Sequence, residues 1–111
     1  MNLGSHTYPH AQEQLKAGAI GLWPIGSTEA HGPHLPLDTD VVISHETCRR
    51  AQAPLAELGI GSLILPPLSY TLTDCAAPFA GTLSLPKEVV QPYVRRFCGA
   101  PRNRAFGWCG W

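Results

Sequence analysis

Two short apolar runs, separated by a segment long enough for a helix, constrain the fold of this chain more than any other feature. The first run covers residues 19–25 and lies next to glycines, and the second covers residues 62–65 and is followed by two prolines. Short apolar runs of this kind are typical of strands that a sheet buries on both faces. Strands that alternate with helices form parallel sheets with right-handed crossovers. We therefore predict an α/β fold with a mainly parallel sheet.

Apolar residues at helical spacing predict a helix over residues 41–58, between the two strands. The stripe consists of Val41, Cys48, Ala51, Leu55 and Leu58. Three residues are suited to cap the start of this helix, namely Asp38, Thr39 and Asp40. Gly59 is suited to end it. Pro54 is expected to kink the helix, because a proline removes a backbone hydrogen bond.

Shorter signals predict the remaining elements. Residues 10–17 have a helical composition and are followed by a glycine, which is typical of a helix end. Residues 69–81 are expected to form a loop. A third helix is expected to start near Pro86, because proline suits the first turn of a helix.

Length and charge limit the classes of function. The 111 residues suffice for a single domain, and the 44% of apolar residues are enough for a core. Eight basic residues balance eight acidic ones, so we expect no nucleic-acid partner and no membrane partner. The chain has no long apolar run and no signal-peptide pattern, which favours a cytoplasmic protein. Its four cysteines form no CxxC pair, so we interpret them as buried or incidental thiols.

The segment of residues 24–40, PIGSTEAHGPHLPLDTD, carries the chemistry. Its candidate metal ligands are Glu29, His31, His34, Asp38 and Asp40. Carboxylate oxygens combined with imidazole nitrogens suit zinc, manganese or iron better than calcium or magnesium. Prolines and glycines fix an irregular backbone path, which helps to hold ligands without a helix. The alternative interpretation is a helix cap accompanied by solvent-exposed histidines.

The same segment closely resembles the signature of the creatininase, or creatinine amidohydrolase, family. The matching residues are Pro24, Gly26, Ser27, Glu29, His31, Gly32, Pro33, His34, Leu35, Pro36, Leu37, Thr39 and Asp40. The resemblance continues in residues 65–70 and in residues 79–85, where the family carries a Phe-Pro-Gly-Thr element. It covers residues 18–97 of this chain.

The resemblance implies a hydrolase that acts on amide bonds, often cyclic or formyl amides, with two divalent metal ions, zinc or manganese and in some cases iron. It implies that Glu29 binds one metal ion, that His31 binds the other and that Asp40 bridges both. His34 and Ser27 would then lie behind the ligands or on the substrate side. Asp38 would either alter metal affinity or cap the helix. The implied fold is a creatininase-like three-layer sandwich, and the implied partners are a small-molecule amide substrate and further copies in a homo-oligomer, a hexamer in full-length relatives.

The chain departs from the family towards its end. Full-length members are longer, and their second half supplies further metal ligands and a histidine for proton transfer, so no proton-transfer residue is expected in this chain. We therefore interpret residues 1–111 as a single, partial domain with an incomplete second half. A second interpretation of function is an inactive truncated fragment that keeps only metal-binding or assembly capacity.

The last residues, 98–111, do not resemble the family. Back-translated and read from the third base of each codon, residues 104–111 allow the glycine, phenylalanine and arginine with which relatives enter their next strand. We therefore expect a frameshifted, non-native tail, in which Trp108 and Trp111 are no substrate-binding pair. The alternative is a genuine short paralogue with an unusual tail.

Overall fold

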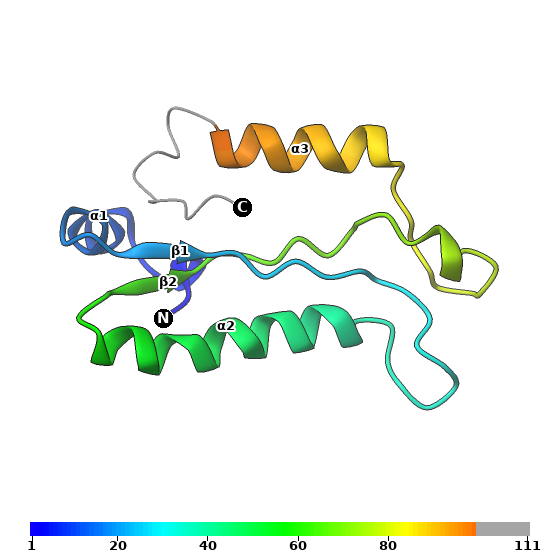
Figure 1. The fold of residues 1–111 in the computed structure, drawn as a ribbon, viewed down its shortest axis with the longest axis horizontal. Coiled ribbons are helices and arrows are strands. Elements are labelled where there is room, and N and C mark those ends of the chain that lie inside the picture. Colours follow the sequence, from blue (N-terminus) through cyan, green and yellow to red (C-terminus); the bar gives the residue numbers. More distant parts are fainter. Residues whose placement is uncertain (100–111) are drawn as a thin grey trace.

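The computed structural model describes residues 1–99 of the chain. Within them it contains three α-helices, two short strands and two 3-10 helices (Figure 1). In chain order these elements are η1 (Leu3–Ser5), α1 (Tyr8–Lys16), β1 (Ile20–Leu22), α2 (Thr39–Glu57), β2 (Ser62–Ile64), η2 (Asp74–Ala76) and α3 (Lys87–Gly99). Figure 1 shows the strands as a middle layer, with α2 on one side and α3 on the other. This arrangement confirms the predicted α/β class.

The two strands pair in parallel, as predicted. Ile20 lies opposite Ser62, and Leu22 lies opposite Ile64. Both strands are shorter than the apolar runs that predicted them. Beyond Leu22 the two segments stay side by side through single contacts, such as the parallel bridge between Ile25 and Leu68. The regular ladder ends there because prolines follow in both runs, and a proline has no amide hydrogen to donate.

The core of the described chain is centred on β2 and the residue after it. Leu63, Ile64 and Leu65 are all buried, whereas β1 is only half-buried. The prediction of a first strand buried on both faces was therefore wrong. The N-terminus lies on the other side of β2, where the Ile64 amide donates to the carbonyl of Met1 at 2.8 Å. Nothing in the sequence pattern indicated this third, very short partner segment.

Helix α2 begins two residues before the predicted start, at Thr39. Its end follows the prediction: Gly59 has a φ of 75°, its amide donates to the Ala56 carbonyl, and the Ile60 amide donates to the Leu55 carbonyl. This pair of bonds satisfies the last carbonyls of the helix. Pro54 lies inside α2 but close to its end. It therefore removes a backbone hydrogen bond only where the helix is about to stop.

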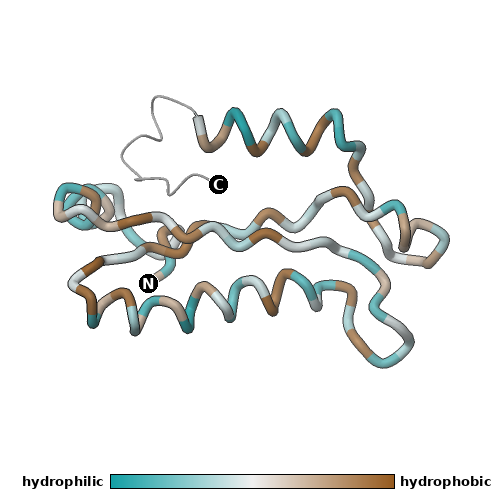
Figure 2. The backbone as a smooth tube through the Cα atoms, in the orientation of Figure 1, coloured by the Kyte–Doolittle hydropathy of each residue, from teal (hydrophilic) through white to brown (hydrophobic). Residues whose placement is uncertain are grey.

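The apolar stripe of α2 is half-buried at four of its five predicted positions, which are Val41, Cys48, Ala51 and Leu55. Helix α2 packs against β2. The fifth position was predicted wrongly: Leu58 is the C-cap residue and is 75% exposed, because the chain turns away there. Figure 2 shows hydrophobic and hydrophilic residues alternating along α2 and α3, as expected for helices that cover a sheet.

Helix α3 follows Pro86 directly, close to the predicted start. Trp23, just after β1, contacts it: the indole ring centroid lies 4.2 Å from that of Phe97 and 6.2 Å from that of Tyr93. The predicted loop over residues 69–81 contains the short η2 helix. No helix within the part of the chain that the structure describes is long and apolar enough to span a membrane.

Three of the four cysteines are free thiols in the structure, namely Cys48, Cys75 and Cys98. Cys98 and Gly99 complete α3. The rest of the predicted frameshifted tail, with Cys109, Trp108 and Trp111, lies outside the described residues.

Candidate metal centre

The candidate ligands come from a loop and from the helix that follows it. After β1 the chain forms a loop that carries Glu29 and His31 and then enters α2, whose second residue is Asp40. The two arms of this loop are joined where the Glu29 amide donates to the Leu37 carbonyl at 2.9 Å. Gly32, with a φ of 80°, allows the turn between the arms. The loop therefore returns Asp40 to the end of the sheet where Glu29 lies.

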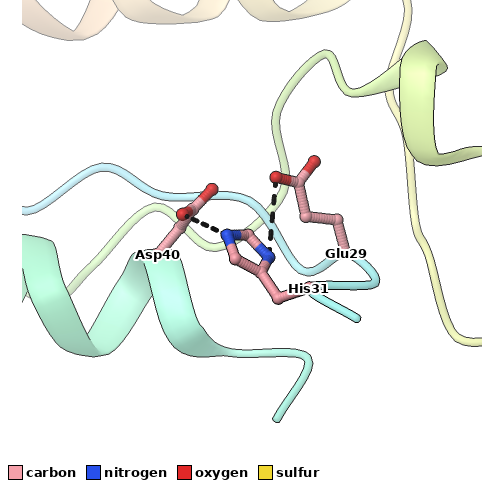
Figure 3. A group of neighbouring side chains, drawn as sticks. All are labelled: Glu29, His31 and Asp40. Atoms are coloured by element: carbon pink, nitrogen blue, oxygen red, sulfur yellow. Dashed lines mark ion pairs between the residues drawn. The ribbon is translucent and has the colours of Figure 1, made fainter. Parts of the chain in front are cut away.

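Glu29, His31 and Asp40 form one cluster (Figure 3). His31 Nε2 lies 3.0 Å from Asp40 Oδ1, and His31 Nδ1 lies 3.8 Å from Glu29 Oε1. Each residue offers one ligand atom, and these atoms all lie within 4.8 Å of one another. The structure thus brings together the three residues that the family resemblance implies as metal ligands.

The electrostatics of this cluster fit a cation. Burial and the neighbouring Asp40 carboxylate raise the pKa of Glu29, and the charge of His31 partly opposes the rise. His31 Nδ1 is buried and has no hydrogen-bond partner. Two carboxylates that face each other and an unpartnered imidazole nitrogen are groups that a bound metal ion would satisfy. The mixed oxygen and nitrogen donors suit zinc or manganese.

The remaining predicted site residues lie outside the cluster. His34 is exposed on the loop. Asp38 occupies the N-cap position of α2, but its side chain makes no capping hydrogen bond. Ser27 is buried, with its Oγ 2.5 Å from Thr71 Oγ1. Asp74, in the following loop, accepts a hydrogen bond from the Ser84 hydroxyl at 2.7 Å. Whether His34, Asp38 or Ser27 affects substrate or metal stays a prediction.

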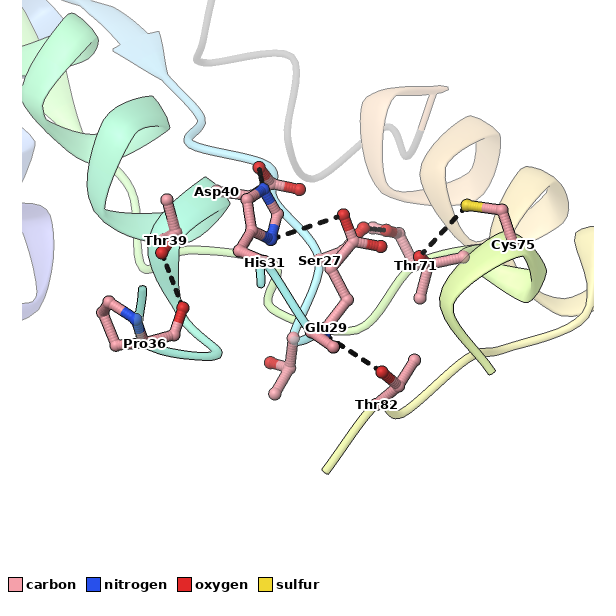
Figure 4. A network of polar contacts seen from close by, with 12 residues as sticks. Ser27, Glu29, His31, Pro36, Thr39, Asp40, Thr71, Cys75 and Thr82 are labelled. Carbon is pink, nitrogen blue, oxygen red and sulfur yellow. Dashed lines mark hydrogen bonds and ion pairs between the residues drawn. The ribbon is translucent and has the colours of Figure 1, made fainter. Parts of the chain in front are cut away.

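Hydrogen bonds to a distant part of the chain support the ligand loop, and Figure 4 shows Thr82 beside this loop. Thr82 Oγ1 accepts a hydrogen bond from the Ala30 amide at 3.0 Å. The Thr28 hydroxyl donates to the Ser69 carbonyl at 2.8 Å. No ligand pattern marks Thr71 or Thr82 in the sequence. Both lie in or beside segments that resemble the creatininase family, but that resemblance does not mark their hydroxyl groups.

A shallow cavity of about 560 Å³ opens beside the cluster. Its polar lining includes Asp40, Ser27 and Thr71. Its apolar lining includes Ile43, Leu72 and Val90. An apolar wall with a few polar groups is typical of sites for small ligands.

The family model for creatininase, described as creatinine amidohydrolase, matches residues 5–103. The chain belongs to the creatininase family. A mycofactocin precursor peptide peptidase from Mycobacterium ulcerans (strain Agy99) is 42% identical over 74 residues, which cover 63% of this chain and 30% of that protein. A creatinine amidohydrolase from Pseudomonas putida is 32% identical over 69 residues, which cover 61% of this chain and 25% of that protein.

Solved creatininase structures share the fold of this chain. A structure described as "Creatininase Mn" superposes with a TM-score of 0.71 at 24% identity. A mutant creatininase of the Zn-Zn type superposes with a TM-score of 0.68 at 25% identity. Both alignments cover 87% of this chain and 40% of the solved chain. The described α/β unit therefore corresponds to part of a creatininase fold.

Proposed function

We propose that this chain contributes metal ligands to a metal-dependent amidohydrolase that hydrolyses the C–N bond of an amide. The observation that carries the proposal is the cluster of Glu29, His31 and Asp40, whose ligand atoms lie within 4.8 Å of one another. Membership of the creatininase family supports the same reaction class. Because the chain spans only 30% of the mycofactocin peptidase and 25% of the creatinine amidohydrolase, the activity of a whole protein is part of the proposal.

The cofactors proposed are two divalent ions, zinc or manganese, as the descriptions of the related solved structures indicate for those proteins. Glu29 would hold one ion, His31 the other, and Asp40 both, since a carboxylate has two oxygens and an imidazole cannot bridge in this way. Divalent ions in such sites lower the pKa of a coordinated water and polarise a carbonyl group. The donors of this chain fit that role because they are close, partly shielded from solvent and of mixed oxygen and nitrogen type.

The substrate proposed is a small molecule with a cyclic, formyl or peptide amide. The cavity beside Asp40 would hold it, with the Ser27 and Thr71 hydroxyls as hydrogen-bonding groups and the apolar residues as its wall. A peptide amide is included because the mycofactocin precursor peptide peptidase shares 42% identity with the aligned part of this chain. Further ligands and a proton-transfer group are expected from the second half of full-length relatives. Metal binding and hydrolysis are therefore separate tests.

The decisive experiment compares His31→Ala with His34→Ala. Both changes remove an imidazole from the same loop, but only His31 belongs to the cluster. Titration calorimetry with Zn²⁺ and Mn²⁺, together with metal content by mass spectrometry, should show binding to the wild type and to His34→Ala and its loss in His31→Ala. Equal binding by all three forms would place any metal elsewhere and refute the site. The same preparations are then assayed with creatinine, a formamide and a short peptide amide.

A further inference from the structure

A bracket of two hydrogen bonds holds the segment that carries Glu29. On one side the Leu83 amide donates to the Thr28 carbonyl at 2.9 Å. On the other side the Ala30 amide donates to Thr82 Oγ1 at 3.0 Å. Two consecutive residues, 82 and 83, therefore form hydrogen bonds with the backbone immediately before and immediately after Glu29.

We infer that Thr82 is a positioning residue of the metal centre, acting through the amide of Ala30. This inference rests on the proposed function, because it assigns Thr82 a role only if Glu29 and His31 bind metal. Ala30 is the single residue between those two ligands, so its amide sets how their backbones are turned relative to each other. Figure 4 shows Thr82 approaching this point from a segment far along the chain.

Thr82 is the part of the bracket that depends on a side chain. Two other bonds, from the Leu83 amide to the Thr28 carbonyl and from the Glu29 amide to the Leu37 carbonyl, join backbone groups. A change of the side chain at position 82 therefore does not remove them. The Thr82 hydroxyl is the acceptor that the structure records for the Ala30 amide, and both residues are half-buried. Removing it leaves a partly shielded donor without a protein partner, which favours rotation of this peptide unit. Ligands must be held within about 0.5 Å of the productive geometry, so such a rotation weakens metal binding.

The test measures metal affinity and fold stability separately in the full 111-residue chain. Thr82→Val removes the hydroxyl at nearly constant volume, and Thr82→Ser keeps it. Thr47→Val is the matched control: its hydroxyl also bonds a backbone group, the Ile43 carbonyl at 2.8 Å, but on the exposed face of α2. Glu29→Gln reports whether the metal site exists at all. Zn²⁺ and Mn²⁺ dissociation constants are measured for each form, together with the melting temperature of the metal-free protein.

We expect Thr82→Val to bind metal roughly 10- to 100-fold more weakly, the loss typical of removing a group that orients a ligand. The metal-free variant should lose some stability, because the Ala30 amide is left without a protein partner, but it should stay folded at the temperature of the binding measurement, as Thr47→Val does. Thr82→Ser should bind as the wild type does. Wild-type affinity in Thr82→Val, with loss in Glu29→Gln, would refute the positioning role and leave the metal site standing. Wild-type affinity in Glu29→Gln would refute both.

A purely structural role gives a different result. In that case metal-free Thr82→Val is partly unfolded at the temperature of the binding measurement, and its loss of affinity follows from the unfolded fraction. If Thr82→Val does not fold, Thr82→Ala removes the same acceptor without the β-branched side chain. Unfolding of both variants, with Thr82→Ser intact, would show that the hydroxyl maintains the fold and would overturn the inference.

Discussion

The backbone of Gly26 lies directly against that of Val41. A β-carbon built on Gly26 would be 2.6 Å from the Val41 amide nitrogen and 2.7 Å from the carbonyl carbon of Asp40. Real side chains do not approach a backbone so closely, so only glycine fits between β1 and the first turn of α2. This close approach is what brings Asp40 beside the loop that carries Glu29.

Gly26→Ala should therefore both destabilise the fold and displace Asp40 from its place beside the ligand loop. We expect a loss of about 1–3 kcal/mol, as for overpacking of a tight site, because backbone atoms cannot be displaced as a flexible side chain can. Gly4→Ala is the control, since its β-carbon would lie 3.9 Å from the nearest atom, Pro66 Cγ. Urea denaturation measures the free energy of unfolding of both variants. Equal stability of the two variants would show that the loop adjusts without cost.

Leu63 marks the centre of the core. It is 0% exposed, whereas Leu58, at the end of α2, is 75% exposed. Leu63→Ala should cost about 2–5 kcal/mol, because it removes buried methyl groups and leaves a cavity. Leu58→Ala should change the free energy of unfolding by less than about 0.5 kcal/mol. Denaturant titration of the two variants checks the difference, and a similar cost for both would contradict the burial described here.

Glu46 should make stability depend on acid pH. Hydrogen bonds from Arg49 and Arg50 lower the pKa of Glu46 from 4.5 to about 2. Because the folded-state pKa is the lower one, the carboxylate stabilises the fold above pH 4.5 and loses this effect as the pH falls towards 2. Glu46→Gln should thus be less stable than the wild type near neutral pH and equally stable near pH 2. An NMR titration that finds the Glu46 midpoint at its ordinary value would contradict this assignment.

The elements that the sequence predicts best are those with local signals. The end of α2 follows from Gly59, whose φ of 75° is unfavourable for other residues, and the start of α3 follows from Pro86. Parallel pairing follows from the helix-length segment between two apolar runs. The exact length of each strand does not follow, because prolines such as Pro24 interrupt the ladder while the two segments stay side by side through isolated hydrogen bonds.

The site, too, contains residues that the sequence could predict and residues that it could not. Glu29, His31 and Asp40 could be predicted as candidate ligands because residue types marked five candidates in one segment and the resemblance to the creatininase family singled out these three. Thr82 could not, because its role depends on a contact across 52 positions in the sequence. The N-terminal residue beside β2 is a second case, since only the tertiary structure places the Met1 carbonyl against Ile64. Local chemistry is readable from sequence, whereas long-range hydrogen bonds require the fold.

Asp40 and Asp38 are two residues apart, but only Asp40 belongs to the metal cluster. Asp40 lies 3.0 Å from His31 Nε2 and belongs to the cluster. Asp38 is exposed at the N-cap and makes no capping hydrogen bond with its side chain. Changing each to asparagine keeps the shape of the side chain and removes one negative charge. The two variants therefore differ in position and not in chemistry.

Asp40→Asn should lose metal-dependent stabilisation while the metal-free fold stays intact. Without metal, the change removes the repulsion between Asp40 and Glu29, which offsets the loss of a favourable negative charge in the first turn of α2, about 0.3–1 kcal/mol. With Zn²⁺ at 100 times its dissociation constant, the wild type should gain about 2.7 kcal/mol, because the ion binds only the folded state. Asp38→Asn should keep that gain, and Asp40→Asn should show almost none. Melting curves with and without Zn²⁺ measure both effects, and a full metal-dependent gain in Asp40→Asn would remove Asp40 from the ligand set.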